Sequence, residues 1–95
     1  MTPPELRALI ADSLLVWEVK GARVALDRDA VTVTAADGTV LRLRPAAAED
    51  APLRWWLERP GQRRPYTGVV GLLRGLRNAL GAGDGLPSRL RVSPG

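Results

Sequence analysis

The chain has neither cysteine nor histidine among its 95 residues. Without cysteine it can form no disulfide bond and offers no thiolate, and without histidine it lacks the commonest general base at neutral pH. Ser-His and Cys-His catalytic pairs, and the zinc, haem and iron–sulfur sites that need these ligands, are therefore excluded. An oxygen-ligated ion such as magnesium or calcium is the one metal class left, and we expect no cofactor.

The chain also lacks a long apolar run. The longest, Leu14 to Trp17, is far shorter than the roughly 20 residues that span a bilayer. The first residues contain prolines, Glu5 and Asp12, whereas a signal peptide needs a basic start and an unbroken apolar core. We therefore expect a cytoplasmic protein with no transmembrane segment.

Acidic residues are too few to balance the basic ones, and the net charge is +4. The surplus lies in residues 49–95, where eight arginines face four acidic residues, while residues 1–48 are balanced at six of each sign. Such asymmetry suggests an acidic partner. Thirteen arginines against one lysine, with abundant alanine, is also what a GC-rich coding sequence produces without any ligand, and this alternative stays open.

The length and the apolar periodicity predict one α+β domain, residues 1–81. Thr2, the prolines that follow it and Glu5 have the pattern of a capping box, which predicts an N-terminal helix from about Pro3 to Leu15. After residue 20 the apolar period changes from 3.6 to 2. This change predicts a three-stranded antiparallel meander made of segments 23–27, 30–35 and 39–44.

The register of the meander follows from the requirement that its apolar residues share one face. A two-residue turn at 28–29 places Leu26 opposite Val31. A three-residue loop at 36–38, with Gly38 left-handed, places Val33 opposite Leu41. The predicted apolar face consists of Val24, Leu26, Val31, Val33, Leu41 and Leu43. The opposite face is polar, so helices need to cover only one side.

Two further helices are expected to pack on the apolar face. A short one from about Ala51 to Arg59 would start near Asp50 and stop at Pro60-Gly61, with Trp56 in the core. A loop at 61–66 and a longer helix, capped by Thr67 and ended near Gly81, complete the domain. Residues 82–95 are expected to be a flexible basic tail or to add a fourth edge strand at 86–92.

Gly71 and Gly75 lie inside the longer helix, where each glycine costs up to about 1 kcal/mol relative to alanine. Close approach of another backbone would compensate this cost. The approach can come from this chain or from a second copy, which makes a homodimer through Gly71 and Gly75 possible.

The stretch RWWLERPGQRRPYTG, residues 54–68, gathers three of the four aromatic side chains and four arginines. Arginine pairs with carboxylate or neutralises phosphate, and tryptophan or tyrosine anchors an interface or stacks on a base. We predict a small non-catalytic interaction module that binds an acidic protein surface. The predicted partner-binding residues are Trp55, Arg59, Arg63, Arg64 and Tyr66.

Two other interpretations are kept. Nucleic-acid binding would use the same stretch and a phosphate-binding group on the polar face of the sheet, which needs a positive surface that Asp27 and Glu58 do not interrupt. The predicted phosphate-binding residues are Arg42, Arg44, Arg89 and Arg91. Alternatively, the stretch is core tryptophan beside a solvated loop. Enzymatic activity is not expected. Acid–base catalysis without histidine needs a buried carboxylate of raised pKa, and the carboxylates of segments 23–44 fall at turns.

Overall fold

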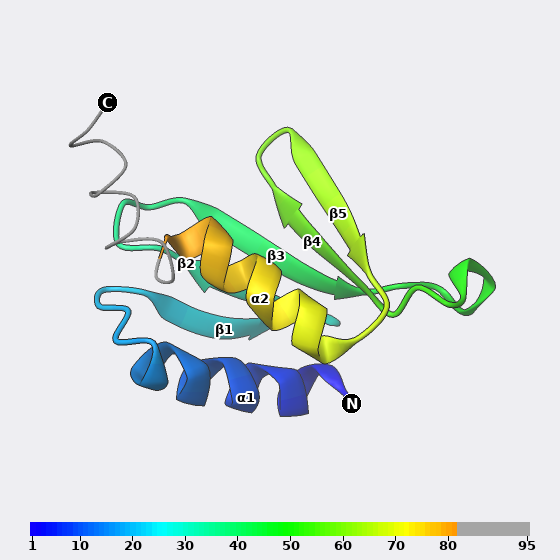
Figure 1. Ribbon diagram of the computed structural model, residues 1–95, viewed down its shortest axis with the longest axis horizontal. Coiled ribbons are helices and arrows are strands. Elements are labelled where there is room, and N and C mark those ends of the chain that lie inside the picture. Colours follow the sequence, from blue (N-terminus) through cyan, green and yellow to red (C-terminus); the bar gives the residue numbers. More distant parts are fainter. Residues whose placement is uncertain (82–95) are drawn as a thin grey trace, which may run out of the picture.

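The computed structural model describes residues 1–81, which form two helices and one five-stranded antiparallel sheet (Figure 1). In chain order the elements are α1 (Pro3–Val16), β1 (Arg23–Asp27), β2 (Ala30–Thr34), β3 (Val40–Pro45), the 3-10 turn η1 (Ala48–Asp50), β4 (Trp55–Arg59), β5 (Gln62–Tyr66) and α2 (Val69–Leu80). The strands are ordered β1-β2-β3-β4-β5, so every strand pairs with its neighbour in the chain. The α+β class is as predicted, but the prediction of three strands and a short helix is wrong. The possible strand at 86–92 lies outside the described residues.

The N-terminal helix begins with the predicted capping box. The side chain of Thr2 accepts a hydrogen bond from the Glu5 backbone N–H, and the Glu5 carboxylate accepts one from the Thr2 N–H at 2.7 Å. Leu6, Ile10 and Leu14, spaced by four residues, are buried against the sheet. The helix thus forms because its start is capped and because one stripe has a core to enter.

The register of β1, β2 and β3 is confirmed. Leu26 lies opposite Val31 and Val33 lies opposite Leu41. The backbone N–H of Ala35 donates to the Thr39 carbonyl at 2.8 Å, and Gly38 has φ +91°, as expected of the three-residue loop. The sheet thereby presents one apolar face to both helices, and the side chains of one core come from all of these elements.

The predicted helix at 51–59 is wrong, because Trp55 to Arg59 form strand β4. Side chains alternate along this strand, so Trp55 and Leu57 face the core while Trp56 and Glu58 face the other side. Pro60-Gly61 does not stop a helix. It makes the two-residue turn of a hairpin, with Gly61 at φ +76°, a sequence that suits a type II turn.

The segment predicted as a loop at 61–66 contains β5, which is the outer strand of that hairpin (Figure 1). Four of its five residues are exposed, and only Tyr66 is partly buried. Pro65 is tolerated because β5 is an edge strand and residue 65 is one of its outward-pointing positions, so the missing donor costs no pairing within the sheet.

Helix α2 ends at left-handed Gly81, as predicted, but Thr67 does not cap it. The N-cap is Gly68, which makes no side-chain hydrogen bond. The ring of Tyr66 packs on the two internal glycines: a Cβ at Gly75 would lie 2.6 Å from Tyr66 Cζ, and one at Gly71 would lie 3.4 Å from its Cδ1. The compensating contact is therefore a tyrosine ring, not a backbone. A homodimer contact through these glycines would have to displace that ring.

The two glycines should respond differently to alanine. We expect Gly75→Ala to lower the free energy of unfolding by about 1–3 kcal/mol, because its methyl group would overlap the Tyr66 ring. Gly71→Ala adds its methyl group at ordinary contact distance and should be neutral or stabilising by up to about 1 kcal/mol. Urea unfolding followed by circular dichroism measures both. Equal effects of the two substitutions would contradict the described packing of Tyr66.

The capping box should make stability depend on pH. Hydrogen bonds from the Thr2 backbone and then the Thr2 side chain lower the pKa of Glu5 below its ordinary value. A lowered folded-state pKa means that the stabilisation is present above the unfolded pKa and is lost as pH falls through the folded one. We expect Glu5→Ala to lower the melting temperature at neutral pH, and the difference from wild type to shrink in strong acid. Asp12→Asn, on the same helix without a capping role, is the control, and a pH-independent effect of Glu5→Ala would refute the mechanism.

Candidate binding face of the sheet

Both helices contribute to the single core on one side of the sheet, which leaves the other side, here called the open face, without a helix (Figure 1). Strand alternation places on it the side chains that do not point into that core. Ordered by strand, they are Arg23, Ala25 and Asp27; Ala30, Thr32 and Thr34; Val40, Arg42 and Arg44; Trp56 and Glu58; Arg63 and Pro65. This face holds both tryptophan and arginine side chains and is the candidate site.

The centre of the open face spans β3, β4 and β5. Register places Arg42, Glu58 and Arg63 in one row across these strands. Arg44, Trp56 and Pro65 form the adjacent row. Side chains of the two rows contact one another diagonally. Arg42, Arg44 and Arg63 each contact a different group.

Arg63 stacks on Trp56. The central carbon of its guanidinium group lies 4.2 Å from the centroid of the indole ring, well within the range of a cation–π interaction. This contact helps to explain why Trp56 is only partly exposed although no helix covers it. The pair forms an amphipathic surface that combines an aromatic ring with a positive charge.

The other two arginines face carboxylates. Arg42 donates to Asp27 at 3.2 Å, and Arg44 Nε lies 3.5 Å from Glu58 Oε2. The second contact is an ion pair by distance but is not aligned as a hydrogen bond, so the buried Arg44 Nε has no hydrogen-bond partner among residues 1–81. Within the same residues no carboxylate oxygen lies within 4.0 Å of Arg63, which sets it apart from Arg42 and Arg44.

The five predicted partner-binding residues are not brought together. Trp55 is 6% exposed and belongs to the core, and Tyr66 packs on α2. Arg59 and Arg64 are exposed, but their side chains point to the opposite side from the open face. They therefore lie on the helix side of the β4–β5 hairpin. Of the five, only Arg63 lies on the open face.

The sequence analysis missed Trp56, which it assigned to the core. The one available signal was Glu58, a charged residue two positions after Trp56, which on a strand would place Trp56 on the polar side. Of the predicted phosphate-binding residues, Arg42 and Arg44 lie on the open face as expected. Arg89 and Arg91 lie outside the described residues.

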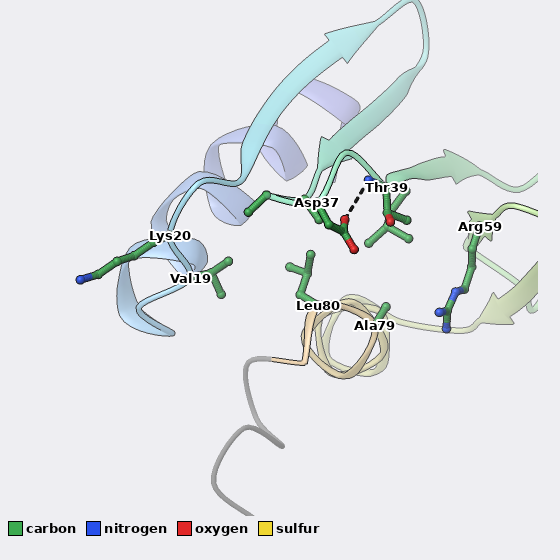
Figure 2. A pocket seen from close by; sticks show the side chains of 10 residues that line it. Val19, Lys20, Asp37, Thr39, Arg59, Ala79 and Leu80 are labelled. Carbon is green, nitrogen blue, oxygen red and sulfur yellow. Dashed lines mark hydrogen bonds between the residues drawn. The ribbon is translucent and has the colours of Figure 1, made fainter. Parts of the chain in front are cut away.

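A cavity of about 380 Å³ lies on the helix side, between the end of α2, the β2–β3 loop and the end of β4 (Figure 2). Asp37 is its central acid, but this carboxylate accepts a hydrogen bond from the Thr39 backbone N–H at 2.9 Å, and that bond lowers the pKa of Asp37. Figure 2 shows Lys20 directed away from the cavity and Arg59 on the opposite side from it. The polar groups therefore do not converge on one ligand position, and the open face remains the better candidate.

Within residues 1–81 there is no group of three or more acidic side chains able to hold a metal ion. In that same range neither helix is long and apolar enough to cross a membrane. Comparisons with protein-family models, with curated proteins and with solved structures found no match. The geometry of the open face is therefore the feature that points to a function.

Alanine substitution distinguishes the roles of the adjacent tryptophans. We expect Trp55→Ala to lower the free energy of unfolding by about 3–5 kcal/mol, because it empties a core position. Trp56→Ala should cost no more than about 1–2 kcal/mol, because it removes one stacked pair at a partly exposed position. Urea unfolding measures both, and a larger loss for Trp56→Ala would mean that the two sides of β4 are assigned incorrectly.

Proposed function

We propose that the protein is a small non-catalytic interaction module that binds an acidic segment of a partner protein through the open face of its sheet. The observation that supports this is the Arg63 guanidinium stacked over Trp56, with no carboxylate oxygen of residues 1–81 within 4.0 Å of it. In this proposal Trp56 takes the role that the sequence analysis assigned to Trp55.

The stacked geometry suits recognition of a carboxylate. Stacking uses the flat face of the guanidinium group, while its N–H groups lie in the plane and stay able to donate. Two parallel N–H donors match the two oxygens of a carboxylate, and such charge-assisted bonds are among the strong ones. The ring beneath holds Arg63 in place, so less side-chain entropy is lost on binding.

An acidic protein is favoured over nucleic acid by the pattern of charge. A phosphate backbone needs a continuous basic track, whereas Asp27 and Glu58 lie among the arginines of the open face. Each of these acids already engages an arginine, which reduces the charge available to phosphate. A short acidic segment needs only the local group around Arg63.

Direct binding tests the proposal. We would measure fluorescence anisotropy of a labelled poly-glutamate peptide and of labelled single- and double-stranded oligonucleotides of similar charge, at low and high salt. We expect the peptide to bind more tightly than the oligonucleotides. Arg63→Ala should weaken peptide binding by about tenfold, the loss expected for one charge-assisted contact. The peptide affinity of Arg63→Lys should fall between those of the wild type and Arg63→Ala, because lysine keeps the charge but not the planar stack.

Arg74→Ala is the matched control, because Arg74 is an exposed arginine on α2, away from the open face. Equal losses for Arg63→Ala and Arg74→Ala, or no peptide binding at low salt, would reject the proposal. Tighter binding to oligonucleotides with a steep salt dependence would favour the phosphate-binding interpretation instead. Cytoplasmic location stays a prediction from the sequence.

A further inference from the structure

The two edges of the sheet differ in their ability to pair with another strand. β1 and β5 are the outer strands. β5 contains Pro65, whereas β1, with the sequence RVALD, contains no proline. Unpaired backbone groups along an edge are a template for a further strand, and proline is one of the devices that blocks it.

The hydrogen-bond pattern shows which backbone groups of β1 point outward. Ala35 bonds to Thr39 across the β2–β3 loop, so the odd-numbered residues of β2 direct their backbone groups to β3. The even-numbered residues must then bond to β1, where their partners are Arg23, Ala25 and Asp27. Val24 and Leu26 are left with their N–H and C=O groups pointing away from the sheet.

The same alternation continued to the other edge leaves Arg63 and Pro65 pointing outward from β5. Pro65 has no N–H to donate, so β5 offers an incoming strand a single outward donor. β1 offers two donors and two acceptors. The edge that can accept a complete strand is therefore β1.

The β1 strand is complementary to a second copy of itself. If two β1 strands pair antiparallel about Ala25, Val24 of each copy lies opposite Leu26 of the other, and these are the residues with outward backbone groups. Arg23 of each copy then lies opposite Asp27 of the other. One register thus satisfies the backbone hydrogen bonds and both charge pairs together. A slip of two residues in either direction would place Ala25 opposite a charged residue and lose this match.

The side chains also match by face. Arg23 and Asp27 lie on the open face, and Val24 and Leu26 lie on the helix side. Leu26 is 42% exposed although it belongs to the apolar side of the sheet, and a neighbouring strand would cover part of it. A two-fold axis perpendicular to the sheet, midway between the Ala25 residues of the two copies, would keep both open faces on the same side.

We propose that the protein forms a two-fold symmetric dimer by antiparallel pairing of β1 with β1 of a second copy. Such a dimer joins two five-stranded sheets into one continuous sheet. It uses a surface distinct from the Gly71 and Gly75 face of α2, and it does not depend on the proposed partner of the open face.

Charge reversal tests the register. Sedimentation velocity over about two decades of concentration should show the wild type shifting from monomer to dimer. Arg23→Asp places two acids opposite each other at both ends of the interface, and Asp27→Arg places two arginines there. Each variant alone should have a dimer dissociation constant raised by about tenfold or more. An equimolar mixture of the two variants should recover a heterodimer, because every pair then has opposite charges.

Arg74→Asp is the control for the change in net charge and should dimerise as the wild type does. Thermal unfolding of each single variant checks that it is folded, and this matters for Asp27→Arg because Asp27 pairs with Arg42 within the chain. A second measurement is amide hydrogen exchange. Protection at Val24 and Leu26 should rise with concentration, while the outward N–H of Arg63 on β5 should not change.

Three results would overturn the proposal: a wild type that stays monomeric at the highest concentration, a dimer unaffected by Arg23→Asp, or a mixture of folded single variants that forms no heterodimer. None of these results bears on peptide binding by Arg63. The failure of one proposal can therefore be told apart from the failure of the other.

Discussion

The structure depends on the alternation of apolar and polar side chains along the three central strands. Val31 and Val33 on β2, Leu41 and Leu43 on β3, and Leu57 on β4 all face one side because their registers agree across two hairpins. A slip of one residue in either hairpin would send these side chains into water. Both helices have their buried stripes on this face, so the register of the sheet also determines where they pack.

The sequence predicts the first part of this arrangement well. In β1 to β3, turn residues and a period of two limit the pairing to one choice, and in α1 a capping box defines the start. The β4–β5 hairpin could not be predicted in the same way. β4 has only five residues, too few to separate a period of 2 from 3.6, and β5 is so exposed that it has no apolar pattern at all.

That error also determined which tryptophan was expected to bind. On a helix, adjacent side chains diverge by about 100°, so Trp56 could share a face with Leu53 and Leu57. On a strand they point to opposite faces, and Trp55 joins Leu57 in the core while Trp56 meets Arg63. The predicted cluster of five residues divides between two sides of the sheet for this one reason. The sequence shows that the site contains tryptophan and arginine. Which of these residues share a face follows only once residues 55–59 are known to form a strand.

Pro65 has a further consequence for the fate of this protein at high concentration. A sheet with two receptive edges can add copies at both and grow into an open-ended fibre, which is the usual hazard of exposed strands. Here the far edge presents a ring in place of a donor, and it does so at a position whose backbone points outward. If two copies pair through β1 as proposed, the remaining edges of the dimer are its two β5 strands, each with a single outward donor. In such a dimer Pro65 would oppose the addition of further strands, because it stands at an outward position of both remaining edges.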